Sequence, residues 1–174
     1  IEKEVKNSND RTWSFWEQSK GSFDDLIIKK WNYASFVGPD FRRNFSLTPY
    51  HYKMLRSASF YKKYSPKKIK SKNNKILKAT VQKIKTEVKG CKVYTDKGNY
   101  YASKVFSSLF DPKSLISQSK FPVLKQHFIG WFIKAPKGRF DPDKILFMDF
   151  NIPQSKQTRF LYLLPQDDQH ALIE

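Results

Sequence analysis

The sequence has one cysteine, Cys91, so no disulfide can form within the chain of 174 residues. This composition fits a reducing compartment. The three histidines, His51, His127 and His170, lie far apart in sequence, and no cysteine or carboxylate stands near them at metal-ligand spacing. We therefore expect no metal site. With six glycines, the chain shows neither a glycine-rich phosphate loop nor a G-x-S-x-G nucleophile elbow.

Long apolar runs are also absent. No run reaches the roughly 18–20 residues that a helix needs to cross a bilayer. We find no signal peptide. Because the first residue is Ile1 rather than Met, we expect the sequence to be an internal piece of a longer protein.

Acidic residues and arginine are scarce. The 33 basic residues exceed the 16 acidic ones by 17, and only six of the basic residues are arginine. This excess has three interpretations: attraction to nucleic-acid phosphates, attraction to anionic lipid headgroups, or solvated surface lysines. Lysine lacks the bidentate fork with which arginine reads guanine. The lysine-rich segment 62–92 also holds few aromatic residues, so we expect no nucleic-acid partner.

Aromatic and β-branched residues are plentiful and predict most of the secondary structure. The segment 26–38 has strand composition, and 92–108 is typical of a hairpin. The segment 48–64 predicts a helix, with Thr48 as N-cap and Pro49 at the first helical position. Four later runs predict strands: "HFIGWFIKA", "KILFMDFNI", "RFLYLLP" and "HALIE". This order predicts an α+β fold with a mostly antiparallel sheet.

Three carboxylates stand beside apolar runs: Glu17, Asp149 and Glu174. A carboxyl group against apolar walls has a raised pKa, stays protonated and can act as a general acid. Alternatively, each side chain points from an amphipathic strand into water. The pattern favours this second interpretation for Glu17 and Asp149.

Four segments together carry a resemblance to a known family. They are "NDRTWSFWE", "FDPDKILFMDF", "TRFLYLLP" and "ALIE", in this order. The chain resembles bacterial lycopene cyclases, FAD-dependent flavoproteins of carotenoid biosynthesis, over essentially its whole length. The resemblance implies reduced FAD as cofactor, with NAD(P)H as reductant and no net redox change.

The resemblance also implies a fold. We expect an α+β chain that forms part of an FAD/NAD(P)-binding flavoprotein fold, with a mostly antiparallel substrate-covering sheet. Residues 1–110 would be a partial FAD-binding domain with an inserted helix and hairpin, and 111–174 a partial substrate-binding sheet. The N-terminal glycine-rich dinucleotide loop would be missing, so we expect these residues alone to be inactive.

Particular residues take roles from the resemblance. Glu174 matches the essential acid of the family, and Glu2 matches the acidic residue that binds the adenosine ribose. Arg11 would lie near the phosphates or ring of the cofactor. The residues expected to line the substrate tunnel or cover the flavin are Trp13, Phe15 and Trp16.

The implied reaction is the proton-initiated cyclisation of the acyclic ends of lycopene to beta-ionone rings. The expected partners are lycopene, carotenoid intermediates and an anionic membrane surface. The expected location is cytoplasmic, peripheral on the inner face of the membrane. Two alternatives remain: a related flavoprotein monooxygenase or isoprenoid reductase, and a basic lipid- or nucleic-acid-binding module without activity.

Overall fold

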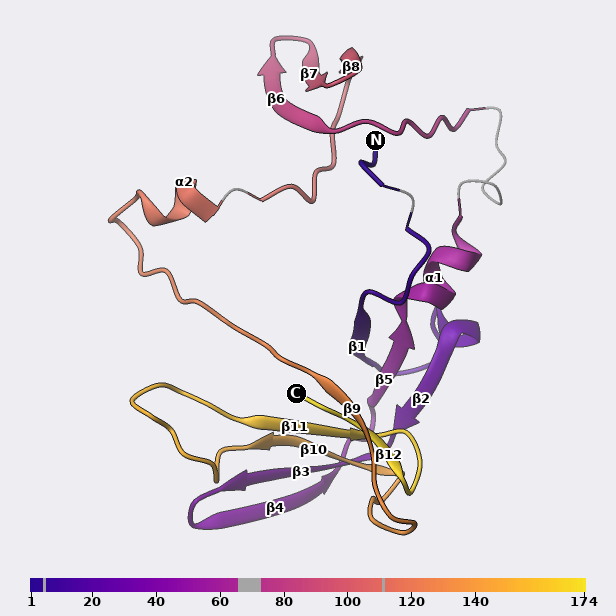
Figure 1. Cartoon of the computed structure of the whole chain (residues 1–174), viewed down its shortest axis with the longest axis vertical. Coiled ribbons are helices and arrows are strands. Elements are labelled where there is room, and N and C mark those ends of the chain that lie inside the picture. Colours follow the sequence, from indigo (N-terminus) through magenta and orange to yellow (C-terminus); the bar gives the residue numbers. More distant parts are fainter. Residues whose placement is uncertain (5, 66–72, 111) are drawn as a thin grey trace. The chain divides into compact units, whose positions relative to one another are not determined.

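The computed structural model describes residues 1–4, 6–65, 73–110 and 112–174 (Figure 1). Its contacts divide the chain into two compact units. Unit 1 contains Ile1–Asn7 and Tyr64–Gln126, and unit 2 contains Ser8–Lys63 and His127–Glu174. The expected division between residues 110 and 111 refers to the domains of a longer flavoprotein, so it stays a prediction.

Unit 1 is built around an antiparallel meander of three strands, in the order β6-β7-β8. Its elements are β6 (Val81–Glu87), β7 (Gly90–Thr95), β8 (Gly98–Ala102) and the short helix α2 (Pro112–Ile116). Gly90 begins β7 at a φ of 133°, and a Cβ there would lie 2.5 Å from the carbonyl oxygen of Ala102. The hairpin expected within 92–108 is present as β7 and β8.

The N-terminal segment of unit 1 pairs with the chain that leads into this meander. The Glu2 amide donates to the Leu77 carbonyl at 3.0 Å, and the Ala79 amide donates to the Glu2 carbonyl at 3.1 Å. These two bonds form a parallel bridge between Glu2 and Lys78. The N-terminal segment is thus held to unit 1 through a single bridge.

Unit 2 contains two sheets. The three-stranded sheet has the order β1-β5-β2, and the six-stranded sheet has the order β4-β3-β10-β11-β12-β9, with one parallel pair between β3 and β10. The strands are β1 (Thr12–Glu17), β2 (Ile27–Trp31), β3 (Tyr33–Gly38), β4 (Phe41–Ser46), β5 (His51–Arg56), β9 (Trp131–Lys134), β10 (Lys144–Asp149), β11 (Leu161–Pro165) and β12 (His170–Ile173). The helices are the 3₁₀ turn η1 (Asp24–Leu26) and α1 (Ser57–Lys63).

The core of unit 2 lies between these sheets. The three-stranded sheet contributes Trp31 and Met54, both 0% exposed. They join a cluster from the neighbouring sheet and its connections: Ala34, Leu47, Ile145, Leu164 and Leu172. The Trp31 indole Nε1 donates to the Pro165 carbonyl at 2.8 Å, which satisfies its polar atom within the core. Burial of these side chains joins the two sheets.

The structure corrects the expected fold class. The α+β flavoprotein fold predicted from the sequence is wrong, because strand accounts for 41% of the chain and helix for 9%. The helix predicted over 48–64 is instead the central strand β5 followed by the two-turn helix α1. Lys53, Met54 and Leu55 are all buried, because β5 is covered on both faces. Tertiary burial has overridden the local helix signals.

The described residues include no helix with the length and apolar character needed to cross a membrane.

Candidate functional site

Strand β1 presents its aromatic residues to two different environments, because successive side chains of a strand point to opposite faces. Trp16 pairs with Tyr52 of β5, and their ring centroids lie 4.7 Å apart. Trp13 lies on the opposite face, where its ring contacts Phe60 at 5.4 Å and Tyr61 at 6.0 Å. Phe15 shares the face of Trp13 by this alternation. The structure therefore does not bring Trp13, Phe15 and Trp16 to one wall.

Trp16 belongs to a continuous series of ring contacts, which we call the aromatic path. Neighbouring ring centroids along this path are between 4.7 and 6.0 Å apart. Edge-to-face and tilted contacts of this kind are the favoured arrangements of aromatic pairs. In order, the path contains Trp31, Tyr52, Trp16, Phe147, Tyr162, Phe160, Phe150, Phe36 and Phe41.

Glu174 lies beside this path. Its amide donates to the Tyr162 carbonyl at 3.0 Å, and the Tyr162 amide donates to the Glu174 carbonyl at 2.8 Å. The antiparallel pairing places both side chains on the face that also carries buried Leu172 and Leu164. A Cβ at Gly130 would lie 3.2 Å from the Glu174 Cγ, so glycine leaves room for this side chain. The carboxyl group thus stands where the buried core gives way to the aromatic path.

Burial raises the pKa values of three groups at this site. Burial raises the pKa of the Glu174 carboxyl above its usual value. Burial also raises the pKa of Tyr52 to about 12, with added repulsion from Tyr162 and Glu174. The pKa of Tyr162 is raised by burial and by the charge of Glu174. Burial therefore favours the protonated form of the Glu174 carboxyl and of both phenols.

Glu17, the last residue of β1, has a different environment from Glu174. Its Oε2 accepts a hydrogen bond from the buried Lys53 Nζ at 2.8 Å. The same ammonium donates to the Ser19 carbonyl at 2.9 Å and to the Asp24 Oδ1 at 2.6 Å. Lys53 is only 2% exposed, so this ion cluster holds β1, β5 and η1 together. Glu17 neither points freely into water nor meets an apolar wall.

Asp149 accepts a local hydrogen bond. Its Oδ1 receives the backbone amide of Asn151 at 2.8 Å, just after β10 ends. This bond turns the chain out of the strand, as aspartate side chains commonly do. Asp149 therefore has a structural role at the end of β10.

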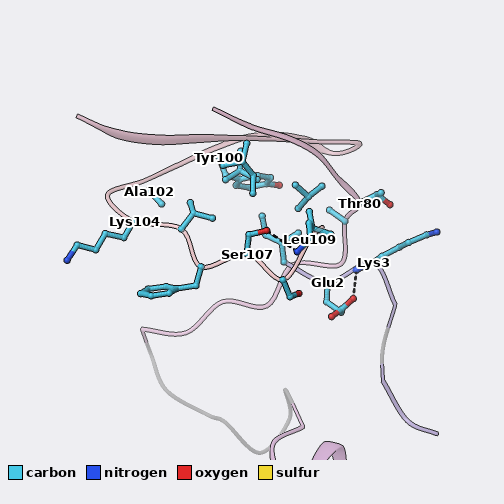
Figure 2. Close-up of a pocket in the computed structure, with 16 residues that line it drawn as sticks. Glu2, Lys3, Thr80, Tyr100, Ala102, Lys104, Ser107 and Leu109 are labelled. Carbon is cyan, nitrogen blue, oxygen red and sulfur yellow. Dashed lines mark hydrogen bonds between the residues drawn. The ribbon is translucent and has the colours of Figure 1, made fainter. Parts of the chain in front are cut away.

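Unit 1 contains a separate pocket of about 370 Å³, within the size range of small-molecule sites. Figure 2 shows Glu2 and Lys3 at one edge and Tyr100 under the meander. The apolar lining includes Ile84, Val93 and Tyr100, which share one face of the meander. The Glu2 Oε1 accepts the Lys3 amide at 3.0 Å. An apolar floor with one carboxylate at its edge fits the base and ribose of an adenosine group.

Arg11 lies in unit 2, whereas Glu2 lies in unit 1. The Arg11 amide donates to the Ser57 Oγ at 3.0 Å, and its carbonyl accepts the Ser57 amide at 2.9 Å. These backbone bonds fix the start of β1 against α1. The cofactor roles expected for Glu2 and Arg11 stay predictions.

Comparison with known proteins assigns the family. The model of the family described as lycopene cyclase protein matches residues 2–174. The chain belongs to the lycopene cyclase family. Membership supports an enzyme of the lycopene cyclase type that acts on a carotenoid. Searches of curated proteins and of solved structures gave no match.

Within this lycopene cyclase family member, sequence reasoning missed three residues beside Glu174. Tyr52, Phe147 and Tyr162 connect Trp16 to the acid. Phe147 and Tyr162 stand in the segments "FMDF" and "FLYLLP" that carried the resemblance, so strand alternation could have placed them together. Tyr52 was not identified because the sequence predicted a helix over 48–64, where the structure has strand β5.

Proposed function

We propose that the protein is a lycopene beta-cyclase and that Glu174 is its general acid. One observation carries the proposal: the half-buried Glu174 carboxyl, whose pKa burial raises, stands beside the aromatic path. Burial favours the protonated form of a carboxyl group, which can transfer its proton to an alkene that binds against it. The family match supports the same class of reaction.

The reaction would begin with a proton passing from Glu174 to the terminal double bond of lycopene. The electron pair of that bond forms the new C–H bond and leaves a carbocation on the neighbouring carbon. A second double bond of the same end group attacks this cation and closes the six-membered ring. Loss of a ring proton then gives the beta-ionone ring, so one proton enters, one leaves and no net redox change occurs.

The aromatic path would hold the substrate and its cationic intermediate. A polyene is long and apolar, and the path is a continuous series of aromatic rings, of which Trp16 and Phe41 are exposed. The quadrupole of an aromatic ring attracts a cation at its face. Tyr162 pairs with Glu174, Phe147 contacts the ring of Tyr162, and Trp16 contacts that of Phe147, so these three rings are the first candidates for this role.

We further propose reduced FAD, with NAD(P)H as reductant, as the cofactor. Glu2 would bind the ribose hydroxyls, and the apolar lining of the unit 1 pocket would receive the adenine. When bound, the reduced flavin would supply electrostatic or proton-handling assistance without net redox change. Glu2 and the apolar lining of this pocket support binding of the adenosine part of FAD only.

Lycopene dissolves in lipid, so we propose that the enzyme works at the cytoplasmic face of a membrane without spanning it. The formal net charge of +17 supports attraction to anionic headgroups.

The complete open reading frame should be expressed in a bacterium that accumulates lycopene, and the extracted pigments separated by chromatography. Conversion to beta-carotene is the expected result. Unchanged lycopene, from a folded and flavin-loaded protein, would contradict the proposal. That outcome would favour a flavoprotein monooxygenase or an isoprenoid reductase.

A further inference from the structure

The meander of unit 1, formed by β6, β7 and β8, has two faces of opposite character. One face carries Ile84, Val93 and Tyr100 and lines the pocket. The opposite face, which we call the lysine face, carries basic and aromatic residues in register across all three strands. Its side chains are Lys83, Lys85, Glu87, Lys92, Tyr94, Asn99 and Tyr101.

The lysine face concentrates like charge. Lys85 lies directly opposite Lys92 on the neighbouring strand, and Lys83 lies two residues before Lys85 on the same side. Like charges directly opposite each other destabilise a sheet. Neither Lys83 nor Lys85 forms an ion pair with any residue that the structure describes. An external anionic surface would remove this repulsion.

The aromatic residues of this face suit an interface between water and lipid. The Lys92 Nζ lies 5.0 Å from the ring centroid of Tyr94 and 5.2 Å from that of Tyr101. Tyr101 is 69% exposed, so its amphipathic ring is available to headgroups. Single-stranded nucleic acid would need free ring faces on which bases can stack. Lys92 already covers one face of each ring, which leaves less ring surface for base stacking, so the geometry favours lipid.

The turn between β6 and β7 carries an exposed apolar residue at its tip. Val88 is fully exposed, at 102%. It stands between Glu87, the acid that shares the lysine face, and Lys89. An apolar tip flanked by lysine can enter the headgroup region while the ammonium groups stay in water.

We propose that the lysine face docks the protein on an anionic membrane surface. This inference rests on the proposed function in one respect, since a carotenoid substrate would reach the enzyme from a bilayer. It goes further by assigning the docking contact to Lys83, Lys85 and Lys92 rather than to net charge in general.

The test measures vesicle binding by the complete protein, with lysine removed in two places. The face variant carries Lys83→Gln, Lys85→Gln and Lys92→Gln. The control variant removes the same charge elsewhere, through Lys30→Gln, Lys134→Gln and Lys137→Gln. Each protein is floated with vesicles of phosphatidylcholine alone and of phosphatidylcholine mixed with phosphatidylglycerol.

We expect binding to the mixed vesicles only, weakened by added salt. The face variant should lose on the order of 100-fold in its partition coefficient, and the control variant should stay near wild type. An equal loss in both variants, or binding to neutral vesicles alone, would overturn the proposal. The wild type and the face variant are also tested with a single-stranded RNA oligonucleotide. If the wild type binds the RNA and the face variant loses that binding but still binds vesicles, the proposal would be overturned in favour of nucleic acid.

Two further variants separate docking from misfolding. Replacing Lys83, Lys85 and Lys92 by arginine keeps the charge and should keep vesicle binding. Glu87→Lys raises the charge of the face by two units and should tighten binding about 20-fold, which no folding defect would produce. No gain from this variant would contradict the proposal.

Cyclisation of detergent-solubilised lycopene separates docking from chemistry. The face variant should retain this activity, because its lysines lie outside the aromatic path. A wild-type protein that binds vesicles but does not cyclise lycopene would disprove the proposed function and leave the docking surface standing.

Discussion

The two faces of strand β1 place carboxyl groups in opposite situations. On one face, Glu17 and Asp24 meet the buried ammonium of Lys53 at 2.8 and 2.6 Å. The hydrogen bond from Lys53 holds the pKa of Asp24 below its usual value. On the other face, Trp16 and Tyr52 lead to Glu174, whose pKa burial raises.

The difference lies in the partner rather than in the carboxyl group. Burial alone would lower the pKa of Lys53, but its hydrogen bonds to Asp24 and Glu17 outweigh burial and raise it. The result is a charged cluster that fixes structure. Burial of Glu174 beside the aromatic path favours its neutral form, so its pKa moves in the opposite direction. The cluster around Lys53 favours charged carboxylates, whereas the surroundings of Glu174 favour the neutral acid.

The largest expected effect comes from replacing Glu174, with the replacement of Glu17 as the comparison. Glu174→Gln should lower cyclisation about 10²–10⁴-fold, because the amide cannot donate the initiating proton. Glu17→Gln should leave cyclisation close to wild type, because Glu17 contacts Lys53 rather than the aromatic path. Pigment conversion in lycopene-accumulating cells measures both. Equal losses in the two variants, with both folded, would abolish the distinction.

The second test removes the cation. Lys53→Met should destabilise unit 2 by about 3 kcal/mol, because it leaves Glu17 and Asp24 without their shared ammonium. Lys144→Met, which breaks an exposed pair with Asp141, should cost about 0.5 kcal/mol. Chemical denaturation measures both free energies of unfolding. Similar values for the two variants would show that the buried cluster is not a stabilising element.

The third test compares two tryptophans of β1. Trp16→Ala should lower cyclisation about tenfold by removing a ring from the path beside the acid. Trp13→Ala should mainly lower the melting temperature, because its ring packs on Phe60 and Tyr61. Pigment ratios and thermal unfolding separate the two effects. A greater loss of cyclisation in Trp13→Ala would place the substrate on the opposite face.

The sequence predicted β2 and β3 as one run, β9 to β12 as four runs, and the family, because their apolar runs and the quoted segments are local signals. It did not identify β1 or β4 as strands. It did not predict β5, because a strand buried on both faces lacks clean alternation and the Thr48-Pro49 start imitates a helix. The partners of Glu17 also escaped prediction. Lys53 and Asp24 lie 36 and 7 residues away, and only strand pairing brings the lysine to the acid.

The smallest expected effect concerns the pH dependence of stability, and the two regions should show opposite slopes. The folded pKa of Glu174 is raised, so the wild type loses stability as pH increases from the unfolded value of about 4.3 through the folded one. Glu174→Gln should therefore gain stability relative to wild type as pH rises.

The folded pKa of Asp24 is lowered, so its contribution is present above an unfolded value of about 3.9 and is lost as pH falls through the folded one. Asp24→Asn should thus be least stable relative to wild type at neutral pH, and the difference should shrink in acid. Melting temperatures of the three proteins, measured from about pH 3 to pH 8, test both signs. Parallel slopes would mean that these two carboxyl groups share one kind of environment, because only opposite pKa shifts produce opposite slopes.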